Sequence, residues 1–140
     1  MVFFGSCTYS IDAKNRVFIP ARYREDLGNI FYITRGIEAC LTMYTEEEWA
    51  LFLQKLDRIP NTTGGGVKEY FMSAAQKCVL DSSGRILLEG ALKAHAQINK
   101  NMVFVGASRV INIWSEENWA LREANRDKEN YATLLSQYEL

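Results

Sequence analysis

The stretch that decides the fold is Asp12-Ala13-Lys14-Asn15-Arg16, and the chain states its pattern a second time. Residues 81–85, which read DSSGR, carry Asp and Arg at the same spacing. Apolar runs with strand character flank both stretches, which predicts a β-hairpin around each one. Asn15 and Gly84 hold equivalent places, and these residue types best tolerate the left-handed conformation that closes such a turn. We call residues 12–16 the first tip and residues 81–85 the second tip.

The duplication extends well beyond the tips. Residues 45–49 read TEEEW, and residues 115–119 read SEENW. Two copies of one supersecondary unit therefore account for most of the chain. Each unit is expected to run strand, turn, strand, short helix, strand, strand and longer helix. The predicted organisation, in order, is a first repeat, a linker, and a second repeat with a C-terminal helix, at residues 1–60, 61–71 and 72–140.

Helix signals fall at matching places in the two repeats. A short helix is predicted over residues 20–27, with Pro20 in its first turn and Gly28 as its stop, and its counterpart lies near residues 89–96. Longer helices are expected to begin at Thr45 and Ser115, which are good N-caps.

Two segments lie outside this repeated pattern. Residues 60–66 contain three consecutive glycines, which predicts a flexible loop between the copies. Residues 122–140 are polar with widely spaced apolar side chains, and we interpret them as a helix that continues from Ser115.

Composition and size limit the fold. The chain has 140 residues, of which 48% are hydrophobic and 24% charged, as in a single globular domain. A copy of about 60 to 70 residues buries too little apolar surface to be stable alone. We therefore expect the two copies to pack into one barrel-like β core, in a mainly β fold with helices (α+β).

Charge and cysteine usage exclude several classes of protein. Sixteen basic and seventeen acidic side chains give a net charge of -1, which argues against a strongly basic, non-specific polyanion binder. We find no signal peptide and no apolar run long enough to span a membrane, so the cytoplasm is the expected compartment. Three cysteines, Cys7, Cys40 and Cys78, form no CxxC pair and are expected to be buried free thiols, without a disulfide or a zinc site.

The sequence contains few of the patterns that are typical of an enzyme. The sole histidine, His95, lies in a predicted helix, and we interpret it as a surface or half-buried residue rather than a ligand. The Asp–Arg pairs lie on tips where a carboxylate stays hydrated, without the desolvation that tunes a catalytic acid. No phosphate-binding glycine loop or metal-ligand cluster is present. We therefore expect no catalytic residues, cofactor, metal or small-molecule substrate.

The strongest local charge surrounds the first tip, where four basic residues fall within residues 14–24: Lys14, Arg16, Arg22 and Arg24. One interpretation is a solvated face, in which the pair Asp12 and Arg16 only stabilises the turn. Repetition of the arginine favours a binding role, because a tip that only turns the chain has no need of it. A β-hairpin fits the major groove of DNA, and arginine bonds O6 and N7 of guanine together.

These features resemble a known family. The two Asp-x-x-x-Arg stretches, with PARYR at residues 20–24, TRG at residues 34–36 and IWS at residues 113–115, resemble the MraZ family. Its members are bacterial transcriptional regulators related to the AbrB-type DNA-binding proteins. The resemblance covers nearly the whole chain.

The resemblance implies a double-split β-barrel of two pseudo-symmetric swapped-hairpin repeats and a ring-shaped homo-oligomer. It further implies binding to double-stranded DNA at short G-rich direct repeats, upstream of the division and cell-wall operon. The regulator's own gene opens that operon in the family, so the implied role is autorepression by a cytoplasmic, nucleoid-associated protein.

Carried over residue by residue, the resemblance assigns roles at both tips. Turn chemistry itself predicts that Asp12, Asp81 and Gly84 shape the turns. Arg22 and Arg24 would contact phosphates. The remaining DNA-contacting positions would be Lys14, Asn15, Arg16 and Arg85. We expect the first tip to lead in recognition, because a basic helix start follows it and the second tip has no lysine.

A different class of function stays open from the residues alone. Near-zero net charge and the apolar residues 2–4 are also typical of a ring-forming module that binds protein rather than DNA. An antitoxin-like role would need a toxin-binding tail, for which residues 122–140 are the candidate.

Overall fold

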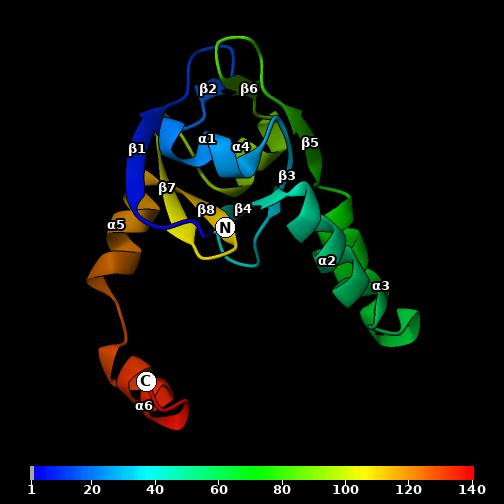
Figure 1. The fold of residues 1–140 in the computed structure, drawn as a ribbon, viewed down its shortest axis with the longest axis vertical. Coiled ribbons are helices and arrows are strands. Elements are labelled where there is room, and N and C mark those ends of the chain that lie inside the picture. The colour runs from blue at the N-terminus through cyan, green and yellow to red at the C-terminus, as the bar shows by residue number, and fades with distance from the viewer. Residues whose placement is uncertain (1) are drawn as a thin grey trace.

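Strands from both repeats form one antiparallel sheet in the computed structural model, which describes residues 2–140 (Figure 1). Its order is β1-β7-β8-β4-β3-β5, and β2 and β6 form a separate two-stranded ribbon. The first repeat supplies β1 (Ser6–Ser10), β2 (Arg16–Phe18), β3 (Ile30–Arg35) and β4 (Cys40–Thr45). The second supplies β5 (Gln76–Val79), β6 (Arg85–Leu87), β7 (Asn101–Ala107) and β8 (Val110–Ser115).

Several strands pair with a strand of the other repeat. The strand before the first tip, β1, pairs with β7, and the strand before the second tip, β5, pairs with β3. At the centre of the sheet β4 pairs with β8, where Thr42 donates to Asn112 Oδ1 at 3.1 Å. A single cluster of buried side chains, which includes Phe31 and Phe104, draws on both repeats. The predicted combination of strands and helices (α+β) and the shared core are confirmed. The fold is not mainly β, because within residues 2–140 the helices contain more residues than the strands.

The expected barrel closure is wrong. The six-stranded sheet ends in two edge strands, β1 and β5, and within residues 2–140 no ladder joins them. Two short helices, α1 (Ala21–Leu27) and α4 (Gly90–His95), lie in front of the strands, below the ribbon of β2 and β6 (Figure 1). The described chain is therefore an open antiparallel sheet with helices, not a closed barrel.

The hairpin prediction holds at the tips and fails beyond them. At the first tip, Asp12 N–H donates to Arg16 O at 2.9 Å, and then the two flanking strands separate. Instead of pairing with β1, β2 pairs with β6, so that Val17 lies opposite Ile86. Both side chains of this pair are buried in the core. Burial of one apolar residue from each repeat favours this pairing over two separate hairpins.

The short helices form where the sequence predicts them. The first, α1 (Ala21–Leu27), follows Pro20 and ends at Gly28, whose φ of 80° is left-handed. Its counterpart is α4 (Gly90–His95).

Side-chain caps begin both longer helices, as predicted. In α2 (Glu46–Asp57), Thr45 Oγ1 accepts from Glu48 N–H at 3.1 Å. In α5 (Glu116–Ala124), Ser115 Oγ accepts from Asn118 N–H at 3.0 Å.

The prediction of a flexible loop at residues 60–66 is wrong, because a helix, α3 (Asn61–Met72), begins there. Gly64 packs against Ile59 so closely that a Cβ would overlap it. The helix is also fixed at its far end, where Tyr70 donates to Gly36 O at 2.6 Å. Packing against α2 adds an edge-to-face contact between Phe52 and Phe71, with ring centroids 5.2 Å apart. These tertiary contacts outweigh the low helix propensity of three glycines.

The C-terminal helix is not continuous with the one that begins after Ser115. After α5 ends at Ala124, a new helix, α6 (Lys128–Gln137), begins and lies away from the sheet (Figure 1). Asp127 starts it by accepting from Asn130 N–H at 3.0 Å. This cap lies inside the segment that we predicted as one helix, and its preference for non-helical backbone explains the break.

The three cysteines are free thiols. Cys40 and Cys78 are buried, as predicted, and desolvation raises the pKa of Cys78 to about 12. Cys7 is only half-buried. Within residues 2–140, no helix combines the length and the apolar character that crossing a bilayer requires.

Candidate nucleic-acid interface

Each tip is organised by the carboxylate that begins it. At the first tip, Asp12 Oδ1 accepts from the backbone N–H groups of Lys14 and Arg16, both at 2.9 Å. Its Oδ2 accepts from Arg16 Nε at 3.0 Å. The carboxylate thereby fixes the backbone of the turn and the direction of the arginine together.

The second tip repeats this arrangement. Asp81 Oδ1 accepts from the N–H groups of Ser83 and Arg85 at 2.9 Å, and Oδ2 accepts from Arg85 Nε at 3.0 Å. Asn15 and Gly84, with φ of 60° and 83°, are the left-handed residues of the two turns. The repeated spacing of Asp and Arg is thus a repeated structure, with the same bonds in both places.

Hydrogen bonds stabilise the ionised form of both carboxyls. Backbone N–H donors, above all that of Arg16, hold the pKa of Asp12 below its ordinary value of 3.8. Asp81 has its pKa lowered in the same way, with the N–H of Arg85 as the largest cause. The bonds that shape the tips are therefore present at neutral pH.

The pH dependence of the tips follows from these shifts. A lowered folded-state pKa gives stability that is present above the unfolded value and lost as the pH falls through the folded value. We expect NMR titration of the Asp12 and Asp81 carboxyl carbons to give midpoints below 3.8, with the shifts of the tip amides changing at the same midpoints. A midpoint above 3.8 at either residue would contradict this geometry.

Both tip arginines lie on the outer face of the ribbon formed by β2 and β6. In the ladder, Arg16 lies opposite Leu87, and Phe18 lies opposite Arg85. Residues opposite one another share a face, and the alternate pair of Val17 and Ile86 faces the core. The outer face therefore carries two arginines, one beside each apolar partner.

The guanidinium groups keep their outer nitrogens available. Nε is the only nitrogen of Arg16 or Arg85 side chains that is hydrogen-bonded among the described residues, and these side chains are 36% and 28% exposed. A two-stranded ribbon fits the major groove, where the two Nη groups of an arginine match O6 and N7 of guanine. The arrangement can thus present two guanidinium forks to base edges.

Sequence reasoning missed the apolar half of this face. Phe18 is 45% exposed and Leu87 is 58% exposed, and Arg85 Cζ lies 5.8 Å from the centroid of the Phe18 ring. Alternation along residues 16–18 and 85–87 is the signal that could have identified them, because each run has a buried residue between two outward ones.

Each short helix lies behind the tip of the other repeat, whereas we expected the basic start of α1 to lie behind the first tip. Arg24 Nε donates to Ile19 O at 2.7 Å, and the guanidinium lies against Gly84 of the second tip. At the first tip, Lys93 of the second repeat donates to Asn15 Oδ1 at 3.1 Å. The antiparallel ribbon explains this crossing, because the end of β2 lies beside the start of β6 and each following helix reaches the other repeat's tip.

The other predicted residues lie in different surroundings. Lys14 is exposed on the first tip. Arg22 is exposed on α1, with its guanidinium against Gly5 in the segment before β1, so the structure does not group it with the tips. His95 Nε2 lies 2.9 Å from Glu38 O, and the residue is half-buried.

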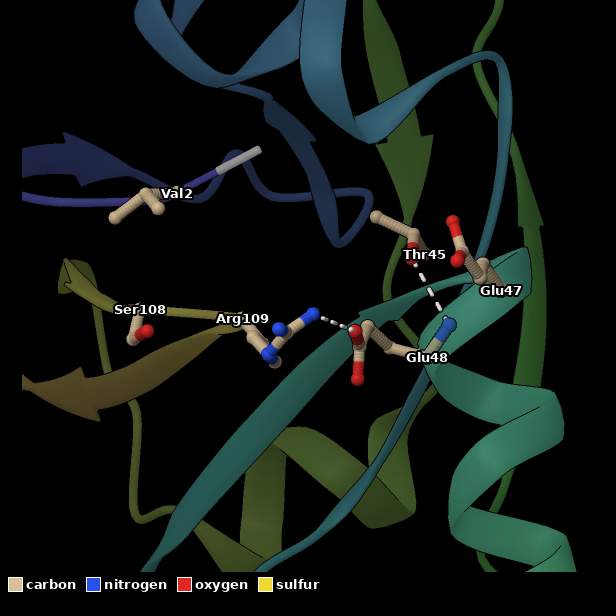
Figure 2. A pocket seen from close by; sticks show the side chains of 6 residues that line it. All are labelled: Val2, Thr45, Glu47, Glu48, Ser108 and Arg109. Atoms are coloured by element: carbon tan, nitrogen blue, oxygen red, sulfur yellow. Dashed lines mark hydrogen bonds and ion pairs between the residues drawn. The ribbon is translucent and has the colours of Figure 1, made fainter.

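A pocket of about 290 Å³ lies away from the tips, between the N-terminal segment, the β7–β8 turn and the start of α2 (Figure 2). Its cation, Arg109, is paired with Glu48 at 3.2 Å, and Glu47 adds a second carboxylate. This charge pattern does not suit a phosphate. Within residues 2–140 no three His, Cys, Asp or Glu side chains gather as metal ligands.

Comparison with known proteins identifies the family. The family model described as "MraZ protein, putative antitoxin-like" matches residues 2–65 and 71–136. The chain is 41% identical over 119 residues to the "Transcriptional regulator MraZ" of Lachnoclostridium phytofermentans and 42% identical over 120 residues to that of Ligilactobacillus salivarius, with 84% of each chain covered in both cases. With the protein of the same name from Clostridium tetani, it shares 37% identity over 139 residues, which covers 97% of this chain and 98% of the relative. These matches confirm the resemblance seen in the sequence: the chain belongs to the MraZ family.

Proposed function

We propose that this chain is a sequence-specific, DNA-binding transcriptional regulator without enzymatic activity. Its relatives carry the name of transcriptional regulator. The observation that carries the proposal is the ribbon: two Asp-x-x-x-Arg units with the same hydrogen bonds present their guanidinium groups from one outer face. A two-stranded ribbon with outward guanidinium donors is an element that the major groove admits.

In the proposed mechanism, Arg16 and Arg85 read guanines, while Asp12 and Asp81 hold them in place through Nε. A guanidinium that is already fixed loses less side-chain entropy when it binds a base. Asn15, at the first tip, would add a further contact to the DNA.

Phosphate contacts would surround these base contacts. Lys14, exposed on the first tip, and Arg22, exposed on α1, supply positive charge for the DNA backbone. Arg24 supplies its charge at the second tip, beside Gly84. Such contacts position the protein and set the salt dependence, whereas the tip arginines carry the sequence preference.

The proposed target is a set of short G-rich direct repeats in the promoter of the division and cell-wall operon, where binding represses the regulator's own gene. The two repeats of the chain would be related as pseudo-symmetric swapped hairpins, and their strand exchange supports this relation. Several chains in a ring would present several ribbons to the repeated boxes of chromosomal DNA in the nucleoid. Avidity then raises affinity without new contacts, provided that box spacing matches ribbon spacing.

A direct test combines binding with size. The wild-type protein is titrated against a duplex of G-rich direct repeats and against a scrambled duplex of the same composition, with light scattering on each mixture. We expect tight binding to the repeats alone and a mass above that of one chain. A multimer that treats both duplexes alike would exclude base-specific recognition and leave the protein-assembly role.

An antitoxin-like, protein-binding role is the second candidate, and one observation favours it. The helix α6 lies away from the sheet and exposes a row of apolar side chains: Tyr131, Leu134, Leu135 and Tyr138. The description of the matching family model also contains the term antitoxin-like. In this role α6 would contact a protein partner, and deleting residues 126–140 would abolish that contact but leave DNA binding intact.

A further inference from the structure

We infer that Lys93 is a positioning residue, through which the short helix of the second repeat holds the DNA-reading tip of the first. The inference rests on the proposed function for its consequence in DNA binding, but its geometry belongs to the free protein. It helps to explain how the short, exposed first tip can present its arginine in a fixed direction.

The first tip is held by two bonds from the second repeat. Leu88 N–H donates to Asn15 O at 2.8 Å, and Lys93 Nζ donates to Asn15 Oδ1 at 3.1 Å. Asn15 is the left-handed residue of the turn, directly before Arg16. Fixing its backbone and its side chain therefore fixes the residue on which the direction of the arginine depends.

The second tip has the mirror arrangement with different chemistry. Ile19 N–H donates to Gly84 O at 3.0 Å, as Leu88 does to Asn15. Arg24, the counterpart of Lys93, donates from Nε to Ile19 O and places its guanidinium beside Gly84. A Cβ on Gly84 would lie 2.5 Å from Arg24 Cζ. The arginine thus occupies the space beside Gly84, and the left-handed φ of 83° favours glycine at this position.

The bonding of Lys93 supports a positioning role over an ordinary surface charge. Lys93 is half-buried, and none of the ion pairs among residues 2–140 includes it. Its only side-chain bond in that part of the chain is the one to Asn15. Because Lys93 has no carboxylate partner among residues 2–140, its bond to Asn15 holds its side chain in place, and the same bond restrains the first tip.

The test uses Lys93→Met, which keeps the length of the side chain and removes its donor. Lys55→Met, on the exposed surface of α2, is the matched control for loss of one charge. We expect Lys93→Met to weaken binding to the G-rich repeats about tenfold, the scale of a hydrogen bond to a charged group. Binding to scrambled DNA and the salt slope stay as in the control. An equal loss on both duplexes, with a salt slope lower by about one, would make Lys93 a phosphate contact and overturn the inference.

A double-mutant cycle separates positioning from other effects. Asn15→Gly keeps the left-handed turn but removes the amide that Lys93 binds. In this background, Lys93→Met is expected to change affinity no further. Full additivity of the two substitutions would show that Lys93 does not act through Asn15.

Hydrogen exchange on the free protein makes the outcome independent of DNA. We expect Lys93→Met to speed exchange of the amides of residues 14–16 and to leave those of residues 83–85 unchanged. Unchanged exchange at the first tip would overturn the inference. If the wild type ignores G-rich DNA while this exchange pattern is observed, the proposed function fails and the positioning contact stands.

Discussion

Arg16→Ala is expected to remove most of the preference of the protein for G-rich repeats over scrambled DNA, because we expect the first tip to lead in recognition. A bidentate contact between arginine and guanine is worth about 1–3 kcal/mol of discrimination, and a multimer loses it at every first tip. The fold should be unaffected, because the Arg16 side chain contributes only an exposed ion pair. The measurement is a gel-shift titration on both duplexes, with thermal unfolding of each variant as the check on folding.

The control for this experiment is Arg109→Ala, which removes an exposed arginine in the turn between β7 and β8. It should bind both duplexes as the wild type does. Arg85→Ala, compared with Arg16→Ala, shows which tip leads. Undiminished preference in the protein lacking both tip arginines would contradict base reading by the ribbon.

A fragment that ends at residue 60 is expected to remain unfolded on its own. Within residues 2–140, four of the six strand ladders join the two repeats, and the other two, β3–β4 and β7–β8, each lie within one repeat. Cutting the chain between repeats leaves Phe31 and Ile33 without the second repeat's half of the core. We expect an unfolded far-UV circular dichroism spectrum and a narrow range of NMR amide shifts for residues 1–60, and the same for residues 61–140.

Mixing or co-expressing the two fragments tests whether each is unfolded because it lacks the strands and core residues of the other. The exchanged ladders should form between separate chains, so the mixture should regain the amide spectrum of the intact protein. A folded first fragment alone would show that each repeat has its own core, against the shared cluster seen here.

The sequence predicts the structure well where contacts between residues close in the chain determine it. Thr45 and Ser115 begin their helices as their residue types indicate. The repeated tips are also local, because Asp12 bonds atoms no more than four residues away. Such contacts depend on spacing along the chain, which a sequence displays directly.

Long-range partners could not be predicted in the same way. Adjacent apolar runs suggest pairing of β1 with β2, whereas burial of Val17 against Ile86 pairs β2 with β6. That exchange also determines which helix stands behind which tip, so the role of Lys93 depends on a contact between residues 78 positions apart. The helix through Gly64 likewise depends on tertiary packing rather than propensity.

The most direct test of guanine reading by the tips replaces guanine with 7-deazaguanine in the G-rich repeats, which removes the N7 acceptor and keeps base pairing. Wild-type affinity should fall about tenfold for each guanine that an arginine contacts. The double variant with Arg16→Ala and Arg85→Ala should bind the 7-deazaguanine duplex and the unmodified duplex equally. Wild-type binding that does not change on 7-deazaguanine substitution would contradict the claim that the ribbon reads guanine in the major groove.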